Sequence, residues 1–332
     1  MTVRIGTRAS KLALTQTQQT ADQLAAVGGF PVELVHIKTE GDVKTGSLSQ
    51  MGGTGVFVAA LRDALLADTC DVAVHSLKDL PTGAALGLSI AATPKRVDVR
   101  DVLCARDGMT LAELPGGAKV GTGSPRRAAQ LRAARPDIEV LDIRGNVDTR
   151  LGRVPGLPGN LTDVVVPGKS CDLDAVVLAA AGLERMDRLD TVSEFFESDV
   201  MLPAPGQGAL AIECRTNDAP RTAGSTEGSN GVLAQALAAL NDDDTRLAVT
   251  AERAVLARLE AGCAAPVGAY AFRKGSMLHL EAVVCAVDGT KTVREKKATD
   301  GLTEVGATLL GIEVAELLLA AGAAEIADLA AS

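Results

Sequence analysis

The chain is poor in histidine and has no closely spaced pair of cysteines. Its 332 residues include only three histidines, widely separated at His36, His75 and His279, so a His-based metal centre or a Ser-His-Asp triad has very few candidates. The six cysteines lie far apart with no C-x-x-C pair, which argues against a zinc site, a redox pair and a disulfide framework. We therefore expect no metal site, and any cysteine with a chemical task works alone.

Long apolar segments and a basic surplus are also missing. The longest apolar runs, such as 174–183 and 314–324, are short or interrupted by charges, and no basic segment followed by an apolar one opens the chain. These features argue against a membrane span and a signal peptide and leave the cytoplasm as the expected location. The net charge of −9 disfavours a nucleic-acid partner, because such proteins carry a surplus of basic side chains that neutralise phosphates.

The chain does have abundant apolar residues and one basic region. Hydrophobic residues make up 47% of the sequence, enough to bury the cores of two or three domains at this length. Between Lys119 and Arg153 there are eight basic residues and four acidic ones, a surplus of four within an acidic protein. An anionic small ligand is the simplest interpretation of this local excess.

A strand-to-helix turn with a serine cap is predicted twice. Residues 4–10 read Arg-Ile-Gly-Thr-Arg-Ala-Ser, and residues 119–127 read Lys-Val-Gly-Thr-Gly-Ser-Pro-Arg-Arg. In both, a short strand leads through Gly-Thr to a serine that caps a helix. Backbone N–H groups at a helix start attract anions, and Arg8 adds a bidentate donor beside them. Arg126 and Arg127 fall in a first helical turn, where the macrodipole disfavours cations, and either a bound anion or a salt bridge would offset that cost.

Two further predicted strands end in polar turns. Residues 71–77 alternate as a strand and run into Lys78 and Asp79, and a later strand runs into Arg144, behind which a capped helix carries Arg150. Open α/β sheets place ligands at the carboxyl ends of their strands, so we expect these turns to bring the arginines toward one cleft. For Lys78 and Asp79, an exposed ion pair before a turn is the alternative.

Several segments are interpreted as connections. The glycine-rich segment 41–55 is typical of a mobile lid rather than a phosphate cradle, since it lacks the terminal Gly-Lys-Ser/Thr of a P-loop. Residues 93–98 and 202–208 are interpreted as hinges, and the irregular excursion 152–169 as a surface loop. The polar segment 217–231 is predicted to be a linker or exposed loop.

The last third is predicted to be a small α+β domain with an antiparallel sheet. Helical patterns at 232–240 and 245–259 precede three strand patterns and a C-terminal helix. Cys263 stands where the second helix ends, between Gly262 as a flexible stop and Pro266, which forbids a return to helix. A loop thiol at that place suits a covalent tether, and a small half-buried residue that caps a helix is the alternative.

Six segments in one order resemble the porphobilinogen deaminase family, also called hydroxymethylbilane synthases. They are Arg4–Ser10, His75–Pro81, Val120–Arg127, Arg144–Arg150, Leu202–Gly208 and Leu259–Cys263. The resemblance runs nearly end to end, and this combination is highly specific. It implies an α/β fold of two domains like periplasmic binding proteins around a cleft, plus a small C-terminal α+β domain with an antiparallel sheet. We place the first lobe at 1–95 plus 206–220, the second at 99–202 and the cofactor-anchoring domain at 232–332, with 217–231 as the linker or exposed loop.

The resemblance also implies an activity and a cofactor. Members of the family are transferases of tetrapyrrole biosynthesis, which leads to haem, corrins and chlorophyll. They condense four porphobilinogen molecules head to tail into linear hydroxymethylbilane and release four ammonia. The reaction takes place on a dipyrromethane primer bound through a thioether to the cysteine that Cys263 matches. A monomer that passes its product to uroporphyrinogen-III synthase is implied as well.

The matched residues suit carboxylate-rich ligands. Each porphobilinogen carries an acetate and a propionate, which guanidinium groups bind in pairs. Asp79 matches the catalytic aspartate, whose carboxylate stabilises the cationic methylene-pyrrolenine left when ammonia departs and helps to move protons. The implied cofactor-binding set is Cys263, Ser76, Lys78, Asp79, Thr122, Ser124, Arg126, Arg127, Arg144 and Gly145. The implied substrate-binding set is Arg8, Ser10, Phe57, Arg144, Arg150, Arg185 and Gln207.

Two positions depart from the family pattern, and a second function stays open. Gln50 and Thr54 stand where lysine occurs in the family, which puts a basic contribution from the lid in doubt unless Lys44 supplies it. The alternative function is a cytoplasmic two-lobed protein that binds or senses an anion without catalysis. Asp79 among arginines and an isolated loop cysteine favour the enzyme, whereas a structural role is expected for His75.

Overall fold

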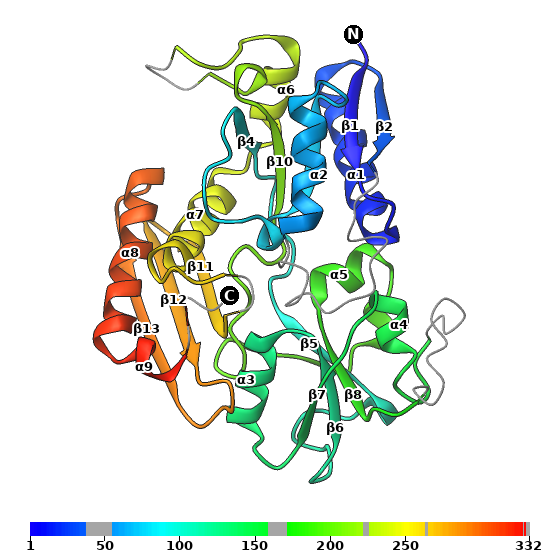
Figure 1. Cartoon of the computed structure of the whole chain (residues 1–332), viewed down its shortest axis with the longest axis vertical. Helices are drawn as coiled ribbons and strands as arrows, with labels where there is room; N and C mark the ends of the chain where they lie inside the picture. The colour runs from blue at the N-terminus through cyan, green and yellow to red at the C-terminus, as the bar shows by residue number, and fades with distance from the viewer. Residues whose placement is uncertain (38–54, 159–170, 222–225, 263–264, 328, 330–332) are drawn as a thin grey trace.

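Three β-sheets organise the part of the chain that the structure describes. The computed structural model describes residues 1–37, 55–158, 171–221, 226–262, 265–327 and 329. Two of the sheets are five-stranded and mixed, the third is three-stranded and antiparallel, and each has its own helices (Figure 1). The predicted fold class, two α/β lobes and a small α+β domain, is confirmed.

The first sheet has the strand order β2-β1-β3-β10-β4. Its strands are β1 (Val3–Thr7), β2 (Val32–His36), β3 (Val72–Ser76), β4 (Leu88–Ala92) and β10 (Leu210–Arg215). Strand β1 is parallel to β2 and β3, whereas β10 is antiparallel to β3 and β4. Helices α1 (Lys11–Gly28), α2 (Gly55–Leu66) and α6 (Val232–Leu240) pack on this lobe.

The second sheet repeats this arrangement with the order β7-β6-β8-β5-β9. Its strands are β5 (Asp101–Ala105), β6 (Lys119–Thr122), β7 (Glu139–Asp142), β8 (Ala175–Ala179) and β9 (Glu194–Phe195), and its helices are α3 (Pro125–Ala134), α4 (Val147–Leu151) and α5 (Ala180–Arg185). Strand β6 is parallel to β7 and β8, as β1 is to its neighbours. The pairing of Gly121 with Val176 matches that of Gly6 with Ala73. The predicted repeat of the strand-to-helix unit is therefore confirmed.

The chain passes between the two lobes twice. It leaves the first sheet after β4 and enters the second at β5, then returns from β9 to β10, which completes the first sheet. The two crossing segments touch, because the N–H of Val97 donates to the carbonyl of Gly208 at 3.4 Å. Gly208 has φ +84°, and a Cβ there would lie 2.8 Å from the Val97 oxygen, so the close approach requires glycine. The segments predicted as hinges, 93–98 and 202–208, lie in these two connections.

The third sheet carries its helices on one face. It consists of β11 (Val267–Lys274), β12 (Met277–Cys285) and β13 (Thr292–Thr299), against which α7 (Asp243–Arg258), α8 (Glu304–Ala320) and the short α9 (Ala323–Ile326) pack. Because side chains alternate across a strand, Leu280 faces Val255 and Val314 in the helix-covered core. Val283 lies in a smaller buried cluster with Leu202, which precedes the return to the first lobe.

The structure contains strands that the sequence patterns do not indicate, and one helix packs on a different domain from the one predicted. Strands β4, β5 and β9 are absent from the predicted elements, and β5 is buried along its whole length, so it lacks the alternation that marks a half-exposed strand. Helix α6, grouped above with the terminal domain at 232–332, packs instead against α1 and β4. Its apolar side chains Leu233, Ala236 and Leu237 belong to the core of the first lobe. That assignment was therefore wrong.

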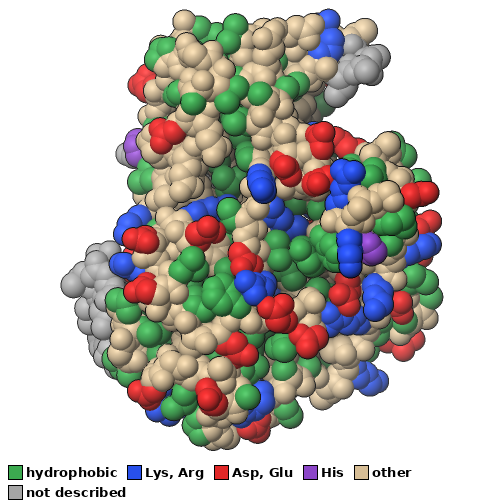
Figure 2. Space-filling view, turned by 180° about the vertical axis from the view of Figure 1, so that it is seen from behind, with side chains coloured by type: hydrophobic (Ala, Val, Ile, Leu, Met, Phe, Trp, Pro, Cys, Tyr) green, Lys and Arg blue, Asp and Glu red, His purple; other side chains and the backbone are tan. Residues whose placement is uncertain are grey.

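The surface seen in Figure 2 mixes charges of both signs. Acidic and basic side chains are interspersed over this face, with apolar patches between them (Figure 2). None of the described helices combines the length and hydropathy that a bilayer crossing requires.

Candidate active site

The turn after β3 carries Lys78 and Asp79 between two buried leucines. Residues Leu77–Asp79 form one turn of 3-10 helix, and Leu77 and Leu80 are buried with Val249 of α7. The polar residues between them are half-buried. Within the described residues, no hydrogen bond or ion pair engages the carboxylate of Asp79. This carboxylate is therefore available to a ligand.

Helix α7 is bonded to this turn. Arg253 donates from Nη1 to the carbonyl of Leu80 at 2.9 Å and from Nη2 to the carbonyl of Pro81 at 2.6 Å. The same helix leads along the chain to Cys263. The element that precedes the predicted tether is thus attached to the turn that carries Asp79.

The end of α7 differs in detail from the expectation. The helix ends at Arg258, and Glu260 turns the chain with a left-handed backbone, φ +53°, although the flexible stop was assigned above to Gly262. Cys263 lies outside the described residues, so the structure does not address its predicted role as a tether. The next described residue, Ala265, is buried.

Arg126 and Arg127 share one buried aspartate. Both side chains open α3 and are 4% and 6% exposed. Arg126 Nη1 lies 2.7 Å from Oδ2 of Asp101, and Arg127 Nη2 lies 2.7 Å from Oδ1. Although burial alone would raise the pKa of Asp101, the charges of the two arginines hold that pKa well below its usual range. Of the two alternatives left open by the sequence, the salt bridge is present.

Lys78 and Arg150 both lie within the field of Arg127. The pKa of Lys78 is lowered to about 8 by burial and by the positive charge of Arg127. Burial, followed by the charges of Arg127 and Arg144, lowers the pKa of Arg150 to about 10. The structure therefore gathers predicted residues from three separate turns into one cationic group, in which a bound anion would relieve the repulsion.

The turn that carries Arg144 has a backbone shape that favours glycine. Gly145 has φ +109°, and a Cβ there would lie 2.8 Å from Cγ2 of Thr149. Arg150 Nε donates to the Gly145 carbonyl at 2.8 Å, and Arg144 Nη2 donates to Asp142 at 3.3 Å. In the described part of the chain the terminal nitrogens of Arg150 have no further partner. These nitrogens and the exposed guanidinium of Arg144 remain available as donors.

The predicted hydroxyl donors sit at turns and caps. Ser10 Oγ accepts from the N–H of Ala13, and Ser124 Oγ accepts from the N–H of Arg127. Thr122 Oγ1, which is buried, accepts from the N–H of Ser124 at 3.3 Å. Since a hydroxyl that accepts a backbone bond still has its own hydrogen to donate, these caps can serve a ligand as well.

The remaining predicted residues are more dispersed. Ser76 is hydrogen-bonded to Gln16 at 3.2 Å, and Arg8 is half-buried between β1 and α1. Arg185 ends α5 and donates from Nη2 to the carbonyl of Gly208 at 3.0 Å, and burial lowers its pKa. The side chain of Phe57, on α2, lies outside what the structure describes. His75 is buried with Nε2 3.2 Å from Glu213.

Gln207 requires a correction. It was predicted to contact substrate, but its side chain is completely buried. Nε2 donates to the carbonyl of Val99 at 2.8 Å and to Oδ1 of Asp101 at 2.9 Å, while Oε1 accepts from Lys78 Nζ at 3.3 Å. Both ends of the amide are thus occupied by protein groups. Asp101 is absent from the residues predicted above, because the sequence around it shows only an acidic residue at the start of an apolar segment.

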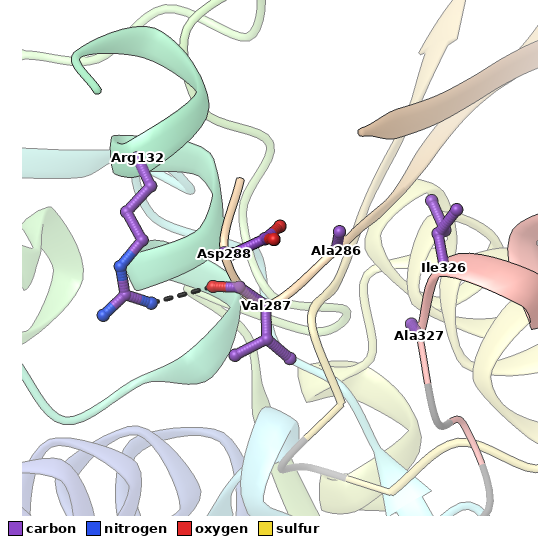
Figure 3. Close-up of a pocket in the computed structure, with 6 residues that line it drawn as sticks. All are labelled: Arg132, Ala286, Val287, Asp288, Ile326 and Ala327. Atoms are coloured by element: carbon purple, nitrogen blue, oxygen red, sulfur yellow. Dashed lines mark hydrogen bonds between the residues drawn. The ribbon is translucent and has the colours of Figure 1, made fainter. Parts of the chain in front are cut away.

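One surface cavity lies apart from these residues. It has a volume of about 670 Å³ and is lined by Arg132, Ala286, Val287, Asp288, Ile326 and Ala327. Figure 3 shows Arg132 reaching from α3 to the chain after β12, where its Nη1 donates to the Val287 carbonyl at 2.8 Å. It contains none of the predicted site residues.

Family models match most of the chain. The model described as porphobilinogen deaminase, dipyromethane cofactor binding domain, matches residues 3–223, and the model of the C-terminal domain of porphobilinogen deaminase matches residues 246–320. The chain belongs to the porphobilinogen deaminase family. Its activity is therefore that of the family, a transferase of tetrapyrrole biosynthesis that uses a dipyrromethane cofactor.

Full-length relatives agree with this assignment. The porphobilinogen deaminase of Cutibacterium acnes is 54% identical over 99% of this chain and 98% of the relative. That of Thermobifida fusca is 52% identical over 99% of this chain and 97% of the relative.

Among solved structures, a periplasmic substrate-binding protein of an ABC transporter from Coxiella burnetii is similar over 72% of this chain and 91% of that chain, with a TM-score of 0.41 and 14% identity.

The described residues fit the family's cofactor. A dipyrromethane carries acetate and propionate side chains, and the cationic group around Arg127 offers fork-shaped guanidinium donors that match carboxylates. Arg126 Nε is also buried without a hydrogen-bond partner in the described part of the structure. Such an orphaned donor is costly unless a ligand or a rearrangement satisfies it.

Proposed function

We propose that Asp79 is the catalytic carboxylate of the deaminase reaction and that Cys263 anchors the dipyrromethane through a thioether. The observation that carries this proposal is the bond between α7 and the Asp79 turn, made by Arg253 to the carbonyls of Leu80 and Pro81. Cys263 follows five residues after the end of this helix. A tether at that point follows directly on the helix that is bonded to the turn.

The cationic group would bind the carboxylates of the cofactor and of the incoming porphobilinogen. When bound, the dipyrromethane supplies the pyrrole carbon to which the first substrate unit is added. The residues proposed for the cofactor are Cys263, Ser76, Lys78, Asp79, Thr122, Ser124, Arg126, Arg127, Arg144 and Gly145. Those proposed for the substrate are Arg8, Ser10, Phe57, Arg144, Arg150 and Arg185.

The proposed role of Asp79 rests on a carboxylate that no hydrogen bond or ion pair within the described residues engages. Departure of ammonia leaves a positive charge on the methylene carbon and pyrrole ring of the substrate, and a fixed carboxylate stabilises that charge as it develops. Two unit charges 4 Å apart attract by about 4 kcal/mol at an effective dielectric constant of about 20. Asp79 is half-buried, and among the described residues no ion pair of its carboxylate has to break first. The same oxygens can accept the pyrrole N–H groups and carry protons between steps.

Intact-mass measurement tests the anchor. Purified wild-type protein should be heavier than the bare chain by one dipyrromethane and should react with Ehrlich's reagent, whereas Cys263→Ser should show neither property. Cys171→Ser is the matched control, because Cys171 is an exposed cysteine outside the proposed site, and it should keep the adduct. An adduct that persists in Cys263→Ser would assign the tether to another residue.

The wider biological setting is also proposed from the family. We infer that the enzyme acts as a monomer in the cytoplasm and passes hydroxymethylbilane to uroporphyrinogen-III synthase. Light scattering after size-exclusion chromatography tests the monomer, and a mass of two or more chains across the working concentration range would contradict it.

A further inference from the structure

A polar chain links the catalytic turn of the first lobe to the arginine pair of the second. It starts at Lys78, whose Nζ lies 3.3 Å from Oε1 of Gln207. Gln207 Nε2 donates to Oδ1 of Asp101 at 2.9 Å. The same oxygen accepts from Arg127 Nε at 2.8 Å, and Oδ2 accepts from Arg126 Nη1 at 2.7 Å. Three elements far apart in the sequence are thereby joined through one buried carboxylate.

The two residues in the middle of this polar chain are buried and held by several hydrogen bonds. Asp101 and Gln207 are completely buried, and Gln207 is also held through its backbone, since its carbonyl accepts from Arg96 Nε at 2.7 Å. Its amide can face only one way, because Nε2 donates both to Asp101 and to the Val99 carbonyl. Oε1 is therefore directed at Lys78, where it accepts a hydrogen bond from the ammonium group.

The charged groups around Lys78 decide how strongly its ammonium form is favoured. Arg126 and Arg127 from α3 disfavour the charged ammonium, whereas Asp79 on its own turn and Asp101 from β5 favour it. Asp101 is thus the carboxylate that offsets the arginine pair as seen from Lys78. Removing its charge would leave these three cations in a buried region with one carboxylate fewer, a costly arrangement.

We propose that Asp101 and Gln207 are positioning residues of the reaction: Asp101 fixes Arg126 and Arg127 and, through the amide of Gln207, holds Lys78 charged and in place. Neither residue touches substrate; both act through the cations that do. The inference rests on the proposed function, because it takes Lys78 and Arg127 to bind carboxylates. It predicts that the two lobes hold their anionic ligands as one unit rather than as independent halves.

The test combines three variants and two measurements. Asp101→Asn, Gln207→Leu and the double variant are compared with the wild type by the dependence of kcat/KM on pH and by competitive acetylation of Lys78, followed by peptide mass mapping across pH. The acetylation reports the Lys78 pKa without any need for turnover. Asp101→Asn should lower that pKa by about half a unit or more and move the alkaline limb of kcat/KM to lower pH by the same amount.

The double variant distinguishes a link from two separate effects. If Gln207 transmits the influence of Asp101, the double variant should shift the Lys78 pKa no further than the larger single change, whereas independent effects add. At pH 8 each single variant should lose roughly tenfold in kcat/KM, as expected for one charge-assisted hydrogen bond, with a smaller change in kcat. Asp101→Glu keeps the charge and should leave the Lys78 pKa at its wild-type value. If Asp101→Asn does not fold, the comparison of Asp101→Glu with Gln207→Leu provides the test.

Asp71→Asn is the matched control. Asp71 also lies between two arginines, 2.7 Å from Arg4 Nη2 and 3.0 Å from Arg215 Nη2, but it lies outside the polar chain. This variant should lose stability without moving the Lys78 pKa or the alkaline limb. If Asp101→Asn and Gln207→Leu also lose stability without shifting the Lys78 pKa or the alkaline limb, the proposal is wrong and the network has a purely structural role. A wild type without deaminase activity would instead refute the proposed function, and the acetylation data would still be interpretable.

Discussion

Glu252 of α7 is a single carboxylate on which three parts of the molecule converge. Its side chain is completely buried. It accepts from Arg96 Nη1 and Nη2 at 2.6 and 3.0 Å, from the N–H of Gly206 at 2.6 Å and from the N–H of Ala271 at 2.8 Å. Arg96 and Gly206 lie in the two segments that cross between the lobes, and Ala271 lies in β11. We predict that Glu252→Ala detaches the third domain from both crossings.

The expected cost follows from these contacts. Removal of one member of a buried ion pair costs about 3–5 kcal/mol, because the other charge stays buried without a partner. Two backbone N–H groups also lose their acceptor, at about 1–3 kcal/mol each before relaxation. Because neighbouring effects do not simply add, we expect about 5 kcal/mol for Glu252→Ala and roughly half that for Glu252→Gln, which keeps one acceptor oxygen.

Urea unfolding followed by circular dichroism measures the effect. With an m-value of about 3 kcal/mol/M, a loss of about 5 kcal/mol lowers the first midpoint by about 1.7 M. Glu316→Ala is the control on the same pair of helices, since its ion pair with Arg258 is about half exposed and is worth about 0–1 kcal/mol. If the two alanine variants unfold at the same urea concentration, the reasoning about Glu252 is wrong.

Three further predictions concern the site and its motion. Asp79→Asn should nearly abolish hydroxymethylbilane formation while circular dichroism stays native and the unfolding midpoint changes little, because no described hydrogen bond or ion pair engages the carboxylate, although its charge favours the ammonium of Lys78; near-normal turnover would remove its assigned role. Since the pKa of Lys78 is lowered to about 8, its ammonium is charged below that pH and neutral above it, so kcat/KM should fall as pH rises through 8. In a Lys78→Met variant this alkaline limb should be absent, and its persistence would assign the titration to another group. Hydrogen exchange should be faster in 93–98 than in strand β3, and equal protection would contradict its role as a hinge.

The sequence alone indicated much of the local structure and the family. The serine caps at Ser10 and Ser124 and the repeated strand-to-helix unit depend on hydrogen bonds or backbone preferences within a few residues. Such features are readable because both partners lie in the same short segment. For the same reason the six family segments could be recognised without any knowledge of how they meet in space.

The tertiary structure decided which charges face one another. Asp101 meets Arg127 across 26 residues, Gln207 meets Asp101 across 106, and Lys78 meets Gln207 across 129. No local preference encodes these contacts, which exist because the chain crosses twice between two similar sheets and is held at both crossings by Glu252. The sequence predicted that Arg127 meets either a bound anion or a salt-bridge partner, and that Gln207 contacts substrate. In the folded protein Arg127 is paired with Asp101, and Gln207 lies between Asp101 and Lys78. Buried charges and amides are stable only where other polar groups satisfy them.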